Sequence, residues 1–387
     1  MTPQPQRIYR TAIVGTGGIA HAHAQATAEL PDRARLVACV DVDIDRARAF
    51  AAQWNIPAVY TSVEDLLADQ NNADQKLDLV HVCTPPGSHV PIAALVMRAG
   101  VDVLVEKPPA LSLAQLDRLF AVEKETGRHV ATVYQHRFGP AAIRLRELIA
   151  AGALGRPLLA TCNTLWYRGD DYFAAPWRGN WDIEGGGPTM GHGIHQFDLL
   201  LSVLGPWAEL TAVAARQSRP TDTEDVSAAI VTFESGAVAT IVNSLVSPRE
   251  TSQLRFDFEN ATVELEHLYG YTHADWRITP LAGQEPSQEA GQESLVQKWN
   301  DGFGSGTPAG DAISSHRGQF VAIFDALDRG EAPPTTSTES RVTMELVAAI
   351  YASAFTGTRV RSGEIEAGHP FYESMLGSGA PWMEAAR

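Results

Sequence analysis

The feature that most constrains the fold is a short apolar run, a glycine-rich turn and a helical pattern, which follow one another in YRTAIVGTGGIAHAHAQATAEL. The turn contains Gly15, Gly17 and Gly18, and Ala20 completes a GxGxxA pattern. In such turns the first glycine permits a tight bend and the second lets backbone N–H groups approach a pyrophosphate, while the third small residue lets helix and strand pack closely. The pattern predicts a strand, a dinucleotide-binding loop and a helix.

An acidic residue stands at the expected distance beyond this turn. The apolar run ARLVACVDVD contains Asp41, which lies 23 residues after Gly18. The acidic side chain that binds the adenosine ribose hydroxyls typically follows the glycine turn by about 20 residues. A carboxylate in that place repels a 2′-phosphate, so the sequence favours NAD as the cofactor. Arg46 and Arg48 follow closely and keep NADP open as the alternative.

Strands and helices continue to alternate through the first third of the chain. Apolar runs at 77–86, 101–110 and 129–138 are separated by helical patterns. This order predicts a parallel, doubly wound α/β sheet with right-handed crossovers, which we place at residues 1–134 as a Rossmann domain. Because ligands of such sheets bind beyond the carboxyl ends of strands, candidate binding segments are Thr84–Pro86, Glu106–Pro108 and Tyr134–Arg137.

Lys107 stands where an apolar strand stops, in the sequence VEKPPA. Pro108 and Pro109 follow and restrict the backbone that carries the lysine. At the end of a parallel strand this side chain is expected to face the cofactor crevice. The alternative is a solvated lysine in a loop.

Residues 135–387 are expected to form a second α/β domain for substrate binding and oligomerisation. Segments between 208 and 280 alternate apolar and polar residues with short turns, which predicts a large, mostly antiparallel open sheet. The polar, glycine-rich stretch 282–312 has no clear period and is expected to be a surface excursion. Two helical patterns, at 316–330 and 338–357, are expected to pack between the domains.

Composition excludes several classes of protein. The 387 residues are 44% hydrophobic and 20% charged with a net charge of −16, and no long basic run is present. Nucleic acid and anionic membranes are therefore not expected as partners, because phosphate binding needs clustered Lys and Arg. No secretory signal and no stretch of about 18 apolar residues is present, so we expect a soluble, cytoplasmic protein. The cysteines lack metal-type spacing, and Cys39 and Cys83 are expected to be buried thiols.

Several of these segments together resemble those of a known enzyme family. The glycine turn, the Thr84-Pro85-Pro86 strand end with His89 after it, and Glu106-Lys107-Pro108 are similar to the glucose-fructose oxidoreductase / inositol dehydrogenase family of NAD(P)-dependent enzymes. The similarity continues through WRGNWDIEGGG and GIHQFDLLLSVLG and covers about the first 205 residues. We assign cofactor binding to Gly15, Gly17, Gly18, Ile19, Asp41, Thr84, Pro85, Pro86, His89, Glu106, Lys107, Gln135 and Arg178.

The resemblance implies oxidation of a secondary hydroxyl on a sugar, cyclitol or sugar derivative, with transfer of the hydride to nicotinamide. It assigns Lys107 a hydrogen bond to the reacting hydroxyl and the nicotinamide ribose, and His195 the role of general base. The chemistry suits these residue types. An alcohol must lose its proton as hydride leaves, imidazole titrates near neutral pH, and an ammonium group stabilises alkoxide character.

The segment GGGPTMGHGIHQFD raises the question of what its two histidines do. Family members commonly carry an aspartate four residues before the histidine, and here that position is Gly191. His192 is a candidate substitute or substrate contact, or alternatively a hydrogen-bonded helix-entry residue; a buried core histidine is the alternative for His195. A metal site of His192, His195 and Asp198 lacks a fourth ligand, so we expect no metal, and we expect Asp198 to pair with a backbone group or an arginine.

Aromatic and arginine residues between 166 and 181 suggest a surface for a polar substrate, because aromatic faces stack on sugar rings and arginine forks bind polyols or carboxylates. Trp166 and Trp181 are expected to pack in the interior. The open sheet has a second face to cover, which in the family pairs with a second subunit, so we expect a homodimer or homotetramer. We assign substrate binding to Arg137, Tyr167, Arg168, Trp177, His192 and His195.

Two other functions stay open at this point. Some relatives keep the cofactor bound and use transient oxidation for glycoside hydrolysis or elimination, without net redox change. A cofactor-binding regulator without catalysis is the other alternative, and Gly191 in place of the aspartate is the feature that favours it. The sequence leaves the identity of the sugar or polyol open.

Overall fold

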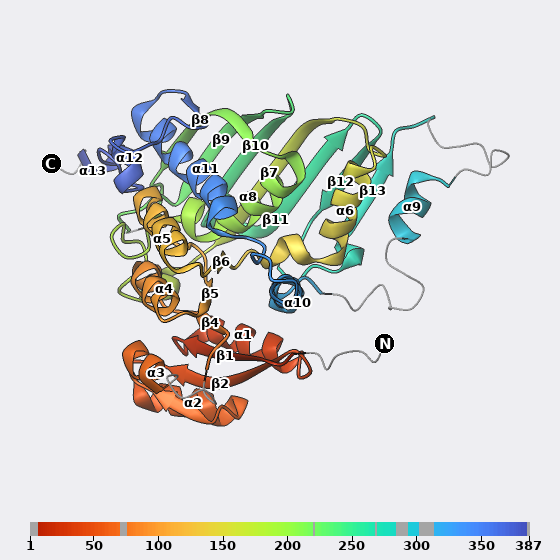
Figure 1. Cartoon of the computed structure of the whole chain (residues 1–387). Coiled ribbons are helices and arrows are strands. Elements are labelled where there is room, and N and C mark those ends of the chain that lie inside the picture. Colours follow the sequence, from red (N-terminus) through yellow and green to blue (C-terminus); the bar gives the residue numbers. More distant parts are fainter. Residues whose placement is uncertain are drawn as a thin grey trace. The chain divides into compact units, whose positions relative to one another are not determined.

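A computed structural model describes residues 7–69, 76–219, 221–267, 269–283, 293–301 and 313–384. The chain divides into two compact units (Figure 1). The first comprises residues up to Val133 together with His316–Arg341, and the second comprises Tyr134–Ser315 and Val342–Arg387. The sequence instead predicts that all of 135–387 belongs to the second domain. The difference arises because the segment after His316 packs its apolar side chains on the first sheet.

The first unit contains a six-stranded sheet in the order β3-β2-β1-β4-β5-β6, with every neighbouring pair parallel. This confirms the predicted doubly wound sheet. The order reverses between β1 and β4, which is the switch point where such sheets bind ligands. The strands are β1 Tyr9–Val14, β2 Ala34–Val40, β3 Ala58–Tyr60, β4 Leu79–Val82, β5 Asp102–Val105 and β6 Val130–Thr132.

Helices connect these strands. Every residue of β4 and β5 is buried, which means that both faces of the sheet centre are covered. One core cluster joins Phe320, Ile323 and Phe324 of the returning helix α10 to Tyr9 and Leu79 of the sheet. The helices are α1 Gly18–Ala28, α2 Ile44–Trp54, α3 Val63–Asp69, α4 His89–Arg98, α5 Leu113–Thr126 and α10 His316–Asp328.

The second unit contains an eight-stranded sheet in the order β13-β12-β11-β7-β10-β9-β8-β14. All of its pairs are antiparallel except β7 with β10, so the prediction of a mostly antiparallel sheet is confirmed. The strands are β7 Pro157–Tyr167, β8 Trp207–Ala215, β9 Val226–Phe233, β10 Val238–Ser244, β11 Val246–Phe258, β12 Ala261–Leu265, β13 Trp276–Pro280 and β14 Val360–Arg361.

Helices cover one face of this sheet. Figure 1 shows α6, α8 and α11 lying across it. A π-helical turn, Thr189–Gly193, leads directly into α8. The helices are α6 Pro140–Ala150, α7 Asp170–Phe173, α8 Ile194–Leu204, α9 Leu295–Asp301, α11 Ser337–Thr356, α12 Pro370–Glu373 and α13 Pro381–Glu384, with α11 beginning in the first unit.

The two faces of the second sheet differ in exposure. Val231 and Ile241 are fully buried on the face toward the helices. On the opposite face Val213 is 67% exposed and Ile230 58% exposed, and the register places Ile230 beside Thr211, two residues from Val213. Leu159 shares this face and is also exposed. The second sheet therefore has an open face that carries apolar side chains.

One local prediction was wrong, and in a second segment the structure adds a helix to the predicted surface excursion. The run 129–138 forms a strand only over Val130–Thr132, and a 3-10 turn follows at Gln135–Phe138 because the chain leaves the first unit there. Within the polar stretch 282–312, Leu295–Asp301 is helical and buries Trp299. The remainder of that stretch, 284–292 and 302–312, lies outside the described residues.

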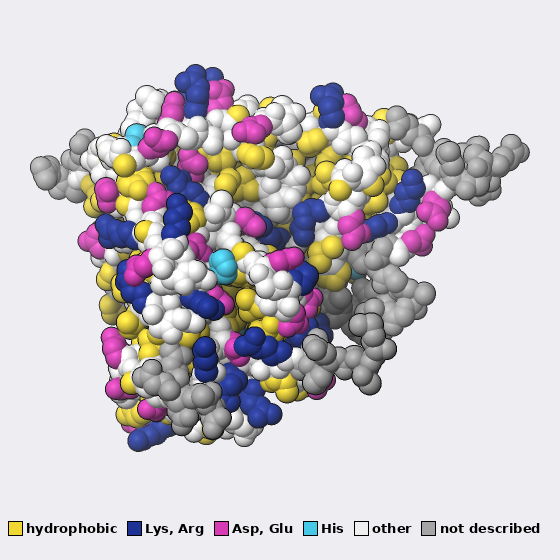
Figure 2. All heavy atoms as spheres, viewed as in Figure 1, with side chains coloured by type: hydrophobic (Ala, Val, Ile, Leu, Met, Phe, Trp, Pro, Cys, Tyr) yellow, Lys and Arg dark blue, Asp and Glu magenta, His cyan; other side chains and the backbone are white. Residues whose placement is uncertain are grey.

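The surface and the cysteines agree with the composition. Figure 2 shows acidic and basic side chains interspersed over the viewed face. All three cysteines are buried as free thiols, as predicted for Cys39 and Cys83. Among the described residues, the helices are too short or too polar to cross a bilayer.

Candidate active site

The glycine turn of the first unit leaves space beside its backbone. Gly15 has a φ of +88°, a conformation that suits glycine, and its N–H donates to the Val40 carbonyl at 2.8 Å. A Cβ added at Gly17 or Gly18 would meet no atom within 4 Å. These two residues form the start of α1, where backbone N–H groups and the helix dipole favour an anion. The turn therefore fits the pyrophosphate of a dinucleotide.

Asp41 lies next to this turn at the end of β2. Its carboxylate accepts hydrogen bonds from the backbone and hydroxyl of Thr16, both at 2.8 Å, and from the backbone of Asp43 at 3.0 Å. Arg46 donates from Nε at 3.0 Å. Burial favours the neutral acid, but these donors outweigh it, Arg46 most of all, and the pKa of Asp41 lies well below its usual range. Asp41 is therefore a fixed anion beside the predicted ribose site.

His89 ties two of the predicted cofactor segments together. The buried ring places Nε2 2.7 Å from the Thr84 carbonyl and Nδ1 2.8 Å from the Pro108 carbonyl. Burial lowers the pKa of His89, so the neutral ring donates to one carbonyl at a time. The structure thus brings Thr84, Pro85 and Pro86 close to Lys107, although His89 itself faces the protein interior.

Lys107 follows β5 at the carboxyl edge of the first sheet and is partly exposed. The Lys107–Pro108 peptide bond is cis. The preceding Glu106 is buried, and its carboxylate accepts from His23, His316 and the backbone N–H of Lys107. The sequence assigned Glu106 to the cofactor, but the hydrogen bonds that its side chain makes are internal.

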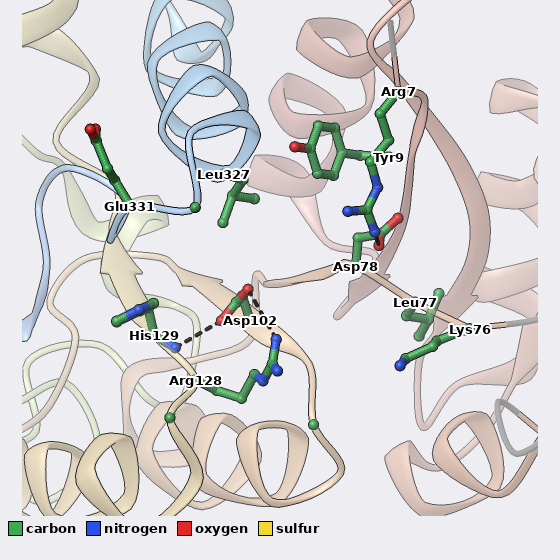
Figure 3. Close-up of a pocket in the computed structure, with 13 residues that line it drawn as sticks. Arg7, Tyr9, Lys76, Leu77, Asp78, Asp102, Arg128, His129, Leu327 and Glu331 are labelled. Atoms are coloured by element: carbon green, nitrogen blue, oxygen red, sulfur yellow. Dashed lines mark hydrogen bonds and ion pairs between the residues drawn. The ribbon is translucent and has the colours of Figure 1, made fainter. Parts of the chain in front are cut away.

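A pocket of about 300 Å³ lies elsewhere on the first unit (Figure 3). Its lining includes Tyr9 at the start of β1, Asp102 at the start of β5 and His129 just before β6. Asp102 accepts the backbone N–H of His129 at 2.8 Å, and Arg128 lies 3.9 Å away. The pocket is therefore at the amino ends of the strands, the edge opposite the glycine turn and Lys107.

In the second unit, a buried carboxylate holds the glycine run that precedes His195. Glu224 accepts the backbone N–H groups of Gly187 at 3.0 Å and Thr189 at 3.1 Å, and the Tyr351 hydroxyl at 2.8 Å. Burial raises the pKa of Glu224 to about 7, against the effect of these donors. The backbone at Gly187 lies so close to Glu224 that no side chain would fit between them. A Cβ added at Gly187 would lie 2.0 Å from the Glu224 carbonyl oxygen.

His195 is buried at the start of α8, among other aromatic rings. The His136 ring stands edge-on to it at 5.1 Å between centroids, and the Tyr269 ring does so at 5.5 Å. His136 is in turn within 2.9 Å of the Ser314 hydroxyl through Nδ1. The π-helical turn before α8 is a form of backbone often found at functional sites. His195 thus belongs to a buried polar and aromatic cluster in the second unit.

His192 contacts a second group of polar side chains. Its Nε2 lies 3.1 Å from the Tyr172 hydroxyl, and its ring meets Trp166 edge-on at 5.2 Å. Arg178 contacts the Tyr172 hydroxyl, lies 4.0 Å above the Tyr172 ring and donates to Glu184 at 2.9 Å. Burial raises the pKa of Tyr172 to about 12. The phenol therefore stays protonated and acts as a hydrogen-bond donor or acceptor.

Glu184 lies near the position where the family aspartate is missing. A Cβ on Gly191 would be 3.7 Å from Glu184 Oε1. The other oxygen of Glu184 accepts the backbone N–H of Gly179 at 2.6 Å. A carboxylate is therefore present beside residue 191, although it belongs to a residue seven positions earlier in the chain and is paired with Arg178.

The remaining predicted site residues differ in their burial and in their partners. Arg137 forms a two-pronged ion pair with the buried Asp198, which confirms the arginine partner expected for that aspartate. Arg168 pairs with Glu250 at 2.8 Å and lies over the Trp166 ring. Tyr167 is exposed, Trp177 is half-buried under Arg178, and Gln135 is buried. Trp181 packs on Tyr351, as predicted, whereas Trp166 is only partly buried and contacts the His192 ring.

Sequence reasoning missed several members of these groups, namely His136, Tyr172, Glu184, Glu224 and Tyr269. His136 lies inside the predicted binding segment Tyr134–Arg137, so its residue type could have identified it as a candidate site residue. Tyr172 lies in the short helix α7, and Glu184, Glu224 and Tyr269 lie in turns or loops. Glu184 directly precedes the glycine run, but no local pattern connects any of these four residues to His192 or His195.

Two successive segments of the chain match models of one enzyme family. Residues 9–134 match the model described as an oxidoreductase family with an NAD-binding Rossmann fold. Residues 142–264 match the GFO/IDH/MocA C-terminal domain.

Individual relatives of similar length also match. D-apiose dehydrogenase of Paraburkholderia graminis is 26% identical, over 94% of this chain and 92% of the relative. D-glucoside 3-dehydrogenase of Escherichia coli is 26% identical, over 93% of this chain and 98% of the relative. Among solved structures, the WlbA dehydrogenase from Chromobacterium violaceum, in complex with NADH and UDP-GlcNAcA, gives a TM-score of 0.78 at 26% identity, covering 94% of this chain and 99% of that one.

Proposed function

This chain belongs to the GFO/IDH/MocA oxidoreductase family with an NAD-binding Rossmann fold, and on that premise we propose that it oxidises a secondary hydroxyl of a sugar or sugar derivative with NAD. The observation that carries the proposal is the carboxyl edge of the first sheet. There an open glycine turn and the anionic Asp41 lie together, a combination that suits a dinucleotide with a free 2′-hydroxyl.

The fit of NAD rests on residues of the first unit. The backbone at Gly17 and Gly18 has room for a pyrophosphate, and Asp41 is an acceptor for ribose hydroxyls. Bound NAD supplies the acceptor for the hydride. Arg46 balances the charge of Asp41 through its ion pair, but the carboxylate still disfavours a 2′-phosphate at close range.

We assign proton removal to Lys107 and His195. The Lys107 ammonium stabilises negative charge as it develops on the substrate oxygen. His195 takes the hydroxyl proton, since imidazole titrates in the neutral range and is a common general base. His136 and Tyr269, which enclose the His195 ring, limit its rotation and exclude water from it.

The second unit and the relatives support a sugar or sugar derivative as the substrate class. The group formed by Trp166, Tyr172, Arg178 and His192 offers aromatic faces, a phenol and a guanidinium, which recognise polyols by stacking and hydrogen bonds. The two named relatives act on an apiose and a glucoside according to their names. We propose that this group, with Tyr167 and Arg168, contacts the sugar.

We further propose that a second copy of the chain covers the open face of the second sheet, in a homodimer or homotetramer. The exposed side chains of Val213, Ile230 and Leu159 give that face its apolar character. Ile230→Glu is expected to lower the molecular mass seen in sedimentation to that of a smaller assembly, because it places a charge in the contact. An unchanged mass would place the interface elsewhere.

The test of the activity is a panel of sugars, glycosides, inositols and uronates, assayed for NADH or NADPH formation. The proposal predicts net NADH formation with at least one member and a lower rate with NADP. Product formed without accumulation of NADH would favour the redox-neutral alternative. Tight NADH binding with no hydride exchange across the panel would favour a regulator.

A further inference from the structure

Four polar side chains meet in the interior of the first unit, directly behind Lys107. His23 of α1, His81 of β4, Glu106 after β5 and His316 of α10 are all buried. His23 Nδ1 lies 3.1 Å from His81 Nδ1, and His23 Nε2 lies 3.0 Å from Glu106 Oε1. His316 Nε2 is 3.4 Å from the same oxygen. The mechanism proposed above uses none of these side chains.

The hydrogen bonds define where the protons of this group lie. Burial lowers the pKa of His23 and lowers that of His81 further, so both rings are neutral and each carries one N–H. Because an ionised carboxylate only accepts hydrogen bonds, His23 donates to it through Nε2. Nδ1 of His23 then accepts from His81. The second ring nitrogen of His81, Nε2, has no hydrogen-bond partner among the described residues. Because Nδ1 carries the proton of this neutral ring, Nε2 is unprotonated and can only accept a hydrogen bond.

Glu106 is ionised in spite of its burial. Burial by itself favours the neutral acid, but the hydrogen bonds from His23 and His316 outweigh it, and the pKa of Glu106 lies well below its usual range. Its second oxygen, Oε2, accepts the backbone N–H of Lys107 at 3.1 Å. The carboxylate thus joins the two histidines on one side to the backbone of Lys107 on the other.

We propose that His23 and His316 are positioning residues, which fix the ionised Glu106 so that Glu106 holds the Lys107 backbone in place for the reaction. This inference rests on the proposed function, because it takes Lys107 to be the residue that acts on the substrate. It also gives α10 a role beyond packing, since the first residue of that helix completes the group.

The same atoms have the spacing of a metal site, so the two explanations must be compared. The ligand atoms of His23, Glu106 and His316 lie within 4.8 Å of one another. Structural zinc sites use four protein ligands, and here the described residues supply three. Hydrogen bonds account for the contacts of both histidines with Glu106 and for the Lys107 N–H as well. We therefore interpret the group as a hydrogen-bond network.

The test uses two substitutions of His316 whose amide nitrogens take the place of different ring nitrogens. The amide nitrogen of glutamine lies near the place of Nε2, whereas that of asparagine lies near Nδ1. His316→Gln therefore keeps a donor to Glu106, and His316→Asn removes it while staying polar. Each variant is measured for kcat and KM with an accepted sugar, for NADH affinity and for thermal unfolding.

Gln319 provides the matched control. It lies one turn along α10, is fully buried, and donates to the Thr132 carbonyl at 2.7 Å and the Thr335 hydroxyl at 2.9 Å. Gln319→Ala therefore removes buried hydrogen bonds from the same helix without touching Glu106. It reports what loss of helix attachment alone does to the rate.

The expected result is a split between kcat and binding. His316→Asn lowers kcat between about 10-fold and 100-fold, as small misplacements of a catalytic group do, while NADH affinity stays within about twofold. His316→Gln recovers most of kcat, and Gln319→Ala keeps kcat while losing thermal stability. His23→Gln, which retains a donor to Glu106 and loses the bond to His81, gives an intermediate rate.

Several outcomes would overturn the inference. These are wild-type kcat in His316→Asn, equal losses in the asparagine and glutamine variants, or a loss of kcat in Gln319→Ala as large as in His316→Asn. One equivalent of a transition metal in the wild-type protein that is lost in His316→Asn would replace the hydrogen-bond network with a metal site. Full activity of Lys107→Ala would instead contradict the proposed function, independently of the His316 results.

Discussion

The two glycine-rich turns of the chain look alike in sequence, but their glycines meet different surroundings. At Gly17 and Gly18 in the first unit, an added Cβ would find open space within 4 Å. At Gly186 and Gly187 in the second unit, it would lie 2.3 Å from the Tyr351 hydroxyl oxygen and 2.0 Å from the Glu224 carbonyl oxygen. The first turn leaves room for a ligand, whereas the second is packed against its own core. A run of glycines is therefore no sufficient sign of a binding loop.

The two buried carboxylates behind these segments differ in a related way. Glu106 and Glu224 each accept a backbone N–H next to a candidate active-site segment. Histidine donors keep the pKa of Glu106 well below its usual range. Burial raises the pKa of Glu224 to about 7, and its donors, which are backbone amides and a tyrosine, do not offset this effect. The first unit holds a fixed charge, and the second holds a group that titrates near neutral pH.

The largest expected effect on stability is that of Glu106→Ala. The variant leaves His23, His316 and the Lys107 N–H without their acceptor in a buried place, at a cost of about 3–9 kcal/mol, given about 1–3 kcal/mol for each of these three groups. Denaturant unfolding measures this, with the exposed Glu64→Ala as control. A loss as small as that of the control would mean that the Glu106 network contributes nothing to the fold.

Glu224→Gln sharpens the contrast between the carboxylates through pH. The folded-state pKa of about 7 is raised above the ordinary value of 4.5, so the native protein holds this proton to higher pH than the unfolded chain does. The stabilisation is present below about pH 4.5 and is lost as pH rises through 7. It amounts to about 3 kcal/mol, at 1.36 kcal/mol per pKa unit.

The wild-type free energy of unfolding should therefore fall more steeply between pH 5 and pH 8 than that of Glu224→Gln, when both are measured by denaturant unfolding. Parallel pH dependences in the two proteins would show that Glu224 is ionised throughout this range.

Gly187→Ala tests the packed turn. The new methyl group meets the Glu224 backbone, and relief of that overlap is expected to cost about 1–3 kcal/mol of folding free energy. The same shift displaces the backbone before His195, so kcat is also expected to fall. Unchanged stability would mean that the turn has room that the structure does not show.

Gly17→Ala is the counterpart in the open turn and has the smallest expected effect on stability, under about 1 kcal/mol, because the residue caps α1 and its Cβ meets nothing. NADH affinity, measured by fluorescence titration, is expected to fall, since the methyl group occupies the space beside the pyrophosphate. Unchanged affinity would remove the turn from the cofactor site.

Much of the first unit could be predicted because its signals are local. The spacing from Gly18 to Asp41 and the position of Lys107 after an apolar run fix those residues at the carboxyl edge of a parallel sheet once the strands are identified. The contact of Glu106 with His316 spans 210 positions, and that of His136 with Ser314 spans 178. Apolar periodicity identifies a helix and its buried face, but not which distant element packs on it.

The second unit illustrates the same limit. Alternation predicted its sheet, yet no local pattern links Tyr172 of the short helix α7, or Glu184 and Glu224 of the loops, to His195. The glycine run before His195 has an internal packing reason, because its backbone lies against Tyr351 and Glu224. The open space that distinguishes the first turn is a property of the folded backbone and is absent from the sequence.

We propose that Lys107 and His195 carry the chemistry and that NAD still binds when either side chain is removed. The most direct measurement is the rate of NADH formation by Lys107→Ala and His195→Ala with an accepted sugar, beside their NADH affinity and with the exposed Lys124→Ala as control. The account predicts affinities within about twofold of wild type and turnover at least about 100-fold lower in both variants. Wild-type turnover in either one would contradict it.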